Sequence, residues 1–139
     1  NTFTSKMDPT NAFGADGSNV NVQVTGSTNT FTLDLATAAL ASGADIDWTV
    51  QGSSNTINAD IDVDSATNYM NIDGNSNTVN YDGDGYAGGY FHLTHAGDSR
   101  AFTVDQASTQ DNDWLKITSS GNSGTVCVNQ NDQGSAVGC

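Results

Sequence analysis

The sequence is poor in proline and contains no glutamate. Of its 139 residues one is proline, Pro9, and all 16 acidic residues are aspartate. Proline removes a ladder hydrogen bond from a strand, whereas aspartate suits turns and glutamate suits helices. Because both proline and glutamate are scarce, we expect an almost helix-free chain of short strands and turns, and its length fits one domain.

Positive charge is equally scarce. Lys6, Arg100 and Lys116 face 16 aspartates, and the formal net charge is −13. A surface of this sign repels phosphate backbones and anionic membranes, which argues against nucleic acid as a partner. No stretch approaches the roughly 20 apolar residues that a membrane-spanning helix requires, so we expect no membrane insertion.

The ends of the chain suggest an extracellular protein. The chain begins at Asn1, which we interpret as a secreted chain after removal of its signal peptide, or as a chain trimmed at its start. The only cysteines are Cys127 and Cys139. A disulfide between them would contribute roughly 3 kcal/mol in the chain-entropy model and requires an oxidising compartment. The alternative is a pair of free thiols in the cytosol.

One phrase, Gly-x-Ser/Thr-Asn-Thr followed by alternating apolar residues, recurs along the chain. Three clear copies place an asparagine three residues after the glycine, and two degenerate copies follow. The glycines are Gly26, Gly52, Gly74, Gly97 and Gly121, and the asparagines are Asn29, Asn55 and Asn77. The glycines are separated by 26, 22, 23 and 24 residues, a near-constant period that is typical of a solenoid.

Apolar residues alternate with polar ones on both sides of each glycine, as in Val20, Val22 and Val24 before Gly26. Period two with one buried face indicates a strand, so each repeat is strand, tight turn, strand. Stacked in register about 4.8 Å apart, such units form one continuous core. We therefore predict an all-β fold, a β-solenoid of about five coils of 22–26 residues.

The predicted organisation has three parts. Residues 1–17 form a non-repeat N-terminal arm or cap, residues 18–130 form the solenoid, and residues 131–139 form a tail closed by the disulfide. Within the solenoid, Ala36-Thr37-Ala38-Ala39-Leu40-Ala41 has helical propensity and predicts a single helical turn. If the turns stack, the glycines supply unusual backbone angles and Asn29, Asn55 and Asn77 form a side-chain amide ladder.

The segment from Ser18 to Phe31 resembles the curlin repeat of bacterial curli fibres. It matches that repeat at the serine, at both apolar sites, at the glycine and at the asparagine. The closing glutamine is matched by Gln106 and Gln130, whereas the internal glutamine is replaced in every copy. The resemblance covers about four fifths of the chain and implies a secreted subunit that stacks end to end into an extracellular fibre.

The same expectation follows from the geometry of a solenoid. An unpaired strand edge at each end is a template for another chain, and head-to-tail stacking does not close, so it produces a filament. If the Cys127–Cys139 bridge and residues 1–16 cover the two ends, the protein is instead a monomer or the tip of an assembly. If the arm donates a strand to a neighbour, these end features promote assembly.

Two other binding functions stay open. Tyr81, Tyr86, Tyr90 and Phe91 lie near the glycine loop and suit glycan stacking on a cell-surface or viral appendage. An ice-binding face is suggested by a column of threonines, Thr30, Thr56, Thr78 and Thr125, with Thr103. The second column that such a face requires is too irregular.

The sequence gives little support for catalysis, so we expect that the protein is not an enzyme. His92 and His95 are three residues apart on a strand and point to opposite faces, and we expect His95 to be a satisfied interior residue. Metal binding is the sharper alternative, because calcium takes closely spaced carboxylates and carbonyls. The candidate calcium ligands are Asp82 and Asp84 in one loop and Asp60, Asp62 and Asp64 in one row.

Overall fold

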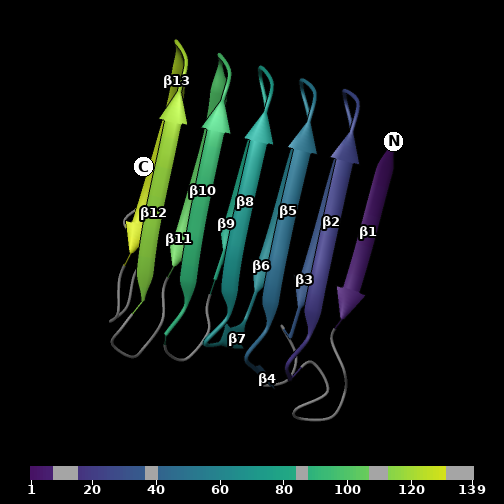
Figure 1. The fold of residues 1–139 in the computed structure, drawn as a ribbon, viewed down its shortest axis with the longest axis vertical. Coiled ribbons are helices and arrows are strands. Elements are labelled where there is room, and N and C mark those ends of the chain that lie inside the picture. The colour runs from purple at the N-terminus through teal and green to yellow at the C-terminus, as the bar shows by residue number, and fades with distance from the viewer. Residues whose placement is uncertain (8–15, 37–40, 84–87, 107–112, 131–139) are drawn as a thin grey trace.

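The protein is a β-solenoid with no helix in the described part of the chain, which confirms the predicted fold class. The computed structural model describes residues 1–7, 16–36, 41–83, 88–106 and 113–130. Within these ranges it contains no helix long and apolar enough to cross a membrane. Two parallel sheets face one another, and the chain passes from one to the other at each turn (Figure 1).

The two large sheets contain alternate strands of the chain. Sheet A has six strands, in the order β1 (Thr2–Met7), β3 (Thr30–Leu35), β6 (Thr56–Ile61), β9 (Thr78–Asp82), β11 (Arg100–Gln106) and β13 (Gly124–Gln130). Sheet B has five strands, in the order β2 (Asn19–Thr25), β5 (Asp45–Gln51), β8 (Thr67–Asp73), β10 (Tyr90–Ala96) and β12 (Trp114–Ser120). Each sheet B strand and the next sheet A strand form one strand-turn-strand unit.

A third, two-stranded sheet lies at the opposite end from the glycine turns. It pairs β4 (Ala41–Ser42) with β7 (Val63–Asp64). The sequence predicts a helical turn over residues 36–41. This prediction is wrong for Ala41, which is in a strand and is buried. Residues 37–40 lie outside the described residues. Ala41 pairs with Val63, so strand pairing has overridden the local helical propensity.

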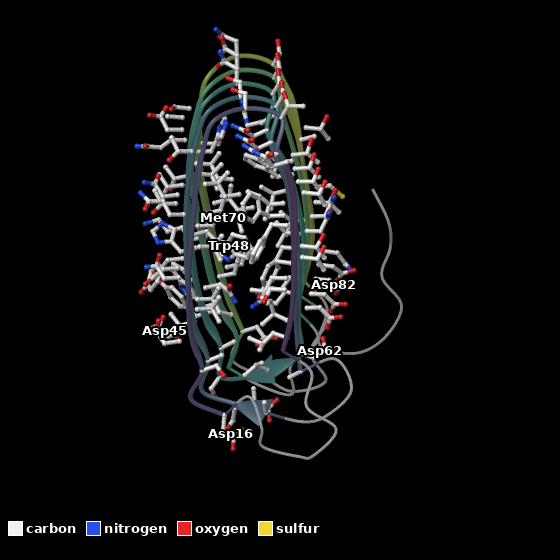
Figure 2. All side chains as sticks on the ribbon, turned by 90° about the vertical axis from the view of Figure 1, so that its right-hand side faces the viewer. Asp16, Asp45, Trp48, Asp62, Met70 and Asp82 are labelled. Carbon is white, nitrogen blue, oxygen red and sulfur yellow. The ribbon has the colours of Figure 1, made fainter. Side chains whose placement is uncertain are left out.

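The register confirms the predicted inward columns. In sheet B, Val24 is opposite Val50, Val50 opposite Ile72, and Ile72 opposite His95. These four side chains are at most 2% exposed. Side chains alternate between the narrow interior and the two outer faces: Trp48 and Met70 point inward, and Asp45 and Asp82 lie on the outer faces (Figure 2).

The glycine turns stack as closely as their strands. The amide of Gly52 donates to Asp73 O at 2.9 Å, and that of Gly74 to Ala96 O at 2.8 Å, so the backbone ladder continues into the turn. A Cβ atom added at Gly52 would clash with the carbonyl oxygen of Gly26. Only glycine fits here, because its φ is also +129°, where L side chains are strained.

The N-terminal residues continue the solenoid as half a unit. β1 pairs with β3 in parallel, with Thr2 opposite Thr30 and Phe3 opposite Phe31. The amide Nδ2 of Asn1 donates to Asn29 Oδ1 at 3.3 Å, which extends the column of turn asparagines. Residues 1–7 are thus the second half of a repeat and not a separate arm; residues 8–15 lie outside the described residues.

Candidate functional site: an open end of the solenoid

The two sheets do not end level at the N-terminal end. β1 extends sheet A by one strand, whereas β2 is the last strand of sheet B, so among the described residues no strand lies opposite β1. The vacant position beside β2 leaves a groove of about 590 Å³ between the sheets. We call this groove the N-terminal slot.

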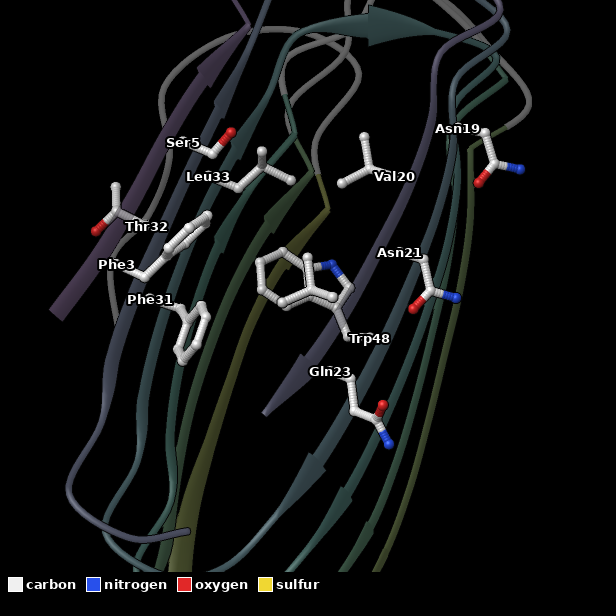
Figure 3. A pocket seen from close by; sticks show the side chains of 11 residues that line it. Phe3, Ser5, Asn19, Val20, Asn21, Gln23, Phe31, Thr32, Leu33 and Trp48 are labelled. Atoms are coloured by element: carbon white, nitrogen blue, oxygen red, sulfur yellow. The ribbon is translucent and has the colours of Figure 1, made fainter. Parts of the chain in front are cut away.

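The walls of the N-terminal slot are apolar. Phe3 and Phe31 form one wall, with ring centroids 5.4 Å apart, and Val20 and Trp48 lie across from them (Figure 3). Phe3 is 52% exposed and Val20 is only partly buried, although both belong to inward columns. The slot therefore exposes core side chains that the next strand of a solenoid would cover.

Trp48 adds an unsatisfied polar group to this apolar slot. Its side chain is 2% exposed, and its indole Nε1 has no hydrogen-bond partner in the described part of the protein. A buried donor without an acceptor costs about 1–3 kcal/mol.

The other end of the solenoid also exposes inward side chains. Val126 and Val128 of β13 are each 42% exposed, whereas Phe102 and Val104, their neighbours on β11, are each 1% exposed. β12 and β13 each have one paired neighbour within the described ranges. Among the residues that the structure describes, both ends thus combine unpaired strand edges with uncovered core residues.

The turn residues singled out in the sequence lie together along one edge of the solenoid. Asn29, Asn55 and Asn77 are at most 6% exposed and stack above one another. Asn55 Oδ1 accepts from the backbone N of Asn29 at 3.0 Å and from its Nδ2 at 3.1 Å, and Asn55 Nδ2 donates to Gly26 O at 3.0 Å. Asn77 repeats the arrangement, with Nδ2 3.0 Å from Gly52 O.

The turns that begin at Gly97 and Gly121 lack this asparagine. Gly97 N donates to Ser120 O at 3.0 Å, so the glycine row continues without it. Each turn also places a serine or threonine two residues after its glycine in the left-handed region. These residues are Thr28, Ser54, Ser76, Ser99 and Ser123, with φ between 56° and 61°.

The residues that match the curlin closing glutamine also meet. Gln106 is 2% exposed and its Nε2 donates to Gly89 O at 3.1 Å. Gln130 Nε2 lies 3.2 Å from Gln106 Oε1. This pair stabilises the opposite corner of the last two units, as the asparagines stabilise the first turns.

Cys127 lies on β13, opposite Thr103 of β11. Its expected disulfide partner, Cys139, lies outside the described residues. The bridge that closes the C-terminal tail therefore stays a prediction.

Of the predicted calcium ligands, the structure brings Asp60 of β6 opposite Asp82 of β9, and it does not gather the other described ones around them. Asp60 is on β6, Asp64 is on β7, and Asp62 lies between these strands. Within the described ranges, no group of three or more His, Cys, Asp or Glu residues could hold a metal ion. Asp82 ends β9 on the outer face, and Asp84 lies outside the described residues, so calcium at that loop stays a prediction.

The two histidines have different surroundings. His92 is half-buried on the outer face of sheet B, whereas His95 is interior and hydrogen-bonded, with Nδ1 3.1 Å from Ser119 Oγ. Of the aromatic residues expected to bind glycans, Tyr81 and Phe91 are interior and stack at 4.1 Å. Tyr90 is on the outer face, and Tyr86 lies outside the described residues.

The threonines expected on an ice-binding face form an interrupted column. Thr30, Thr56 and Thr78 are in register, but Ala101 follows Thr78 before the column reaches Thr125. Thr103 belongs to the next column, with Asn80 and Cys127.

Comparisons with known proteins give no relative for this chain. No protein-family model, no curated protein and no solved structure matches it.

Proposed function

We propose that the protein is a secreted structural subunit that assembles head to tail into an extracellular filament, and that it has no catalytic role. The observation that carries the proposal is the N-terminal slot, where, within the described part of the chain, an unpaired strand edge and uncovered core side chains coincide. A strand from a second copy would pair this edge and cover these side chains.

The opposite end of the same molecule fits this role. All strand pairs are parallel, so stacking two copies in one direction continues the sheet B ladder, and it continues the sheet A ladder once β1 leaves its place beside β3. If β12 of one copy pairs with β2 of the next in the register used within the molecule, Leu115 lies over Val20 and Ile117 over Val22. This contact is heterologous and does not close, so it extends into a filament.

Charge opposes the contact without preventing it. Each copy carries a formal charge of −13, so copies repel one another at low ionic strength. Salt screens this repulsion over about 10 Å at 0.1 M, while the apolar contact is little affected. Filament growth is therefore expected to be faster at higher salt.

The pair of cysteines and the resemblance to the curlin repeat support a role outside the cell. The predicted Cys127–Cys139 bridge requires an oxidising compartment. The likeness to curlin repeats points to the same kind of assembly. The partner that this proposal implies is a second copy of the same chain.

Two variants test the proposal, each with a substitution at a different end of the solenoid. Val22→Asp places a carboxylate in the N-terminal slot, and Val128→Asp places one at the other end. Both valines are partly exposed, so each variant is expected to fold. Burying an unpaired carboxylate is strongly unfavourable, so each variant alone should remain monomeric, while the wild-type protein forms filaments in negative-stain electron microscopy.

Mixing the two variants separates filament formation from nonspecific aggregation. Each variant retains one intact end, so the mixture should form dimers and no longer species in analytical ultracentrifugation. Asn71→Asp is the charge-matched control, because Asn71 is exposed on the outer face of β8, the central strand of sheet B, and it should still form filaments. Wild-type protein that stays monomeric at all salt concentrations would contradict the proposal.

A further inference from the structure

The outer face of sheet B carries an aromatic group that neither the core nor the solenoid ends require. Tyr69 and Trp114 are 44% and 42% exposed, and Tyr90 and His92 lie between them. Tyr90 and Trp114 stack with centroids 4.2 Å apart and planes 2° apart. The other exposed large apolar residues of the described chain, Phe3, Val126 and Val128, all belong to inward columns at the two ends.

A shallow groove runs beside this aromatic group. It encloses about 350 Å³ on the outer face and crosses β2, β5, β8 and β10. Strands that are side by side in Figure 1 contribute successive pairs of side chains to it. The pairs are Asp47 and Thr49 from β5, Tyr69 and Asn71 from β8, and His92 and Thr94 from β10.

The chemistry of this lining suits a sugar chain. Carboxylate, amide and hydroxyl groups can exchange hydrogen bonds with sugar hydroxyls. An exposed tyrosine ring offers an apolar face to the C–H side of a pyranose, with a polar tip beside it. Tyr69 is held by its neighbours, with its ring centroid 5.4 Å from that of Tyr90 and 5.9 Å from that of His92, so little freedom is lost on binding.

The spacing of the groove favours an extended chain. The pairs of groove residues repeat at the strand spacing of about 4.8 Å, because the strands are in register. An extended β-linked pyranose chain advances by about the same distance per sugar. Each sugar would therefore meet one strand, whereas a helical α-linked chain would leave the groove after one or two sugars.

The charge of the face excludes acidic sugars. Asp45 and Asp47 lie on the same outer face, and the formal net charge of the chain is −13. These charges repel carboxylated or sulfated chains. We propose that the groove lined by Asp47, Tyr69, Asn71 and His92 binds neutral, extended, β-linked glycans. This inference does not depend on filament formation.

Calorimetric titration of the full chain with three oligosaccharides tests the proposal. Cellohexaose, a neutral β-1,4-linked chain, should bind. Maltohexaose, its α-linked isomer, and an oligogalacturonate, which is anionic, should each bind at least about tenfold more weakly, equivalent to about 1.4 kcal/mol.

Variants then locate the binding. Tyr69→Ala should weaken cellohexaose binding about tenfold, because it removes the exposed ring whose apolar face would lie against the sugar. The control Thr103→Ala lies on the outer face of the other sheet and should bind as the wild type does. Thermal melts of the two variants check that both remain folded: Thr103→Ala should match the wild type, and Tyr69→Ala, which loses its ring contacts with Tyr90 and His92, should melt cooperatively at a slightly lower temperature.

Three results would overturn the proposal. These are no binding of cellohexaose, equal binding of all three chains, and cellohexaose binding that survives Tyr69→Ala. Loss of self-association in Tyr69→Ala without any glycan binding would also overturn it, since the aromatic group would then be a contact between copies.

Discussion

The imidazole Nε2 of His95 lies 3.2 Å from the carbonyl oxygen of Gly74, the same kind of acceptor that the turn asparagines reach in the earlier units. Asn55 donates to Gly26 O and Asn77 to Gly52 O. In the next unit Arg100 stands where the asparagine would be, and His95 reaches the glycine carbonyl from the neighbouring strand. With Nε2 as donor, Nδ1 is the acceptor for the hydroxyl of Ser119, 3.1 Å away.

This arrangement makes stability dependent on pH. Burial lowers the pKa of His95 below its ordinary 6.5, helped by Arg100, while the Gly74 carbonyl and Asp73 raise it. The unfolded chain therefore binds a proton near pH 6.5 that the folded protein accepts only at lower pH. The stabilisation is fully present above about pH 6.5 and is lost as the pH falls through the folded pKa.

Urea unfolding between about pH 7.5 and about pH 5 measures the effect, in a range above the ordinary titration of aspartate. The midpoint should fall with pH in the wild type and more shallowly in His95→Gln, which cannot titrate. His92→Gln, a change on the outer face, should keep the wild-type slope. A slope unchanged in His95→Gln would contradict the assignment.

The buried asparagine ladder should contribute several times more stability than an exposed amide. Asn55→Ala removes the acceptor of the Asn29 amide and the donor to Gly26 O, both in a buried turn. Leaving such groups unpaired should lower the free energy of unfolding by about 2–4 kcal/mol. Asn58→Ala, which removes an exposed contact with Asn80, should cost less than about 1 kcal/mol in the same urea titration.

The glycines of the stacked turns should differ in how well they tolerate substitution by alanine, because different atoms surround them. At Gly74 a Cβ atom would meet the carbonyl group of Gly52, whereas at Gly26 its nearest neighbour would be Asn29 Nδ2 at 3.7 Å. Both have positive φ, which costs a side chain about 1–3 kcal/mol. Gly74→Ala adds a backbone clash, so its melting temperature should fall well below that of Gly26→Ala. Equal melting temperatures would mean that the turns can separate.

The sequence was sufficient to predict the fold because the repeat is set by local chemistry. Each glycine marks a turn, and the alternation on either side assigns inward and outward residues, so the columns from Val24 to Ser119 follow directly. It was insufficient for the ends. The four residues Asn1-Thr2-Phe3-Thr4 repeat Asn29-Thr30-Phe31-Thr32, but this signal for β1 is weak because it lacks the glycine half of the repeat.

The candidate sites depend on which strands become neighbours, and this limits what sequence can predict. The N-terminal slot exists because sheet A extends one strand beyond sheet B, a relation that no single repeat contains. The aromatic group on sheet B joins Tyr69, Tyr90 and Trp114 from three units. A search for aromatic residues at equivalent outward positions of successive repeats would have found it.

A column of like charges should make the protein more stable in salt. Asp34, Asp60 and Asp82 are in register on adjacent outer positions of sheet A, with Asp105 next, and Lys6 of β1 is opposite Asp34 at the end of the column. Like charges directly opposite one another are destabilising. Asp60→Asn should therefore raise the free energy of unfolding by about 0.5–1 kcal/mol at low salt, and by less at 1 M salt, where the Debye length is about 3 Å. Asp45→Asn, whose register neighbours are Asn19 and Thr67, is the control and should change little.

Removing β1 should change the rate of filament growth, because β1 occupies a position that a neighbouring copy needs. If β12 of a neighbour pairs with β2, its β13 would lie beside β3, where β1 now lies. In that position Val126 would cover Phe31 and Val128 would cover Leu33, in the register that β1 uses. Seven-residue β13 brings two valines to the inward column, whereas β1 brings Phe3 and Ser5 to the same two places. The replacement of β1 by β13 of a neighbouring copy is therefore favourable once β1 leaves.

Deleting residues 1–7 should shorten the lag of filament growth measured by light scattering, and adding a peptide of residues 1–7 should restore the lag. A longer lag after the deletion would show that β1 is part of the surface onto which the neighbour stacks.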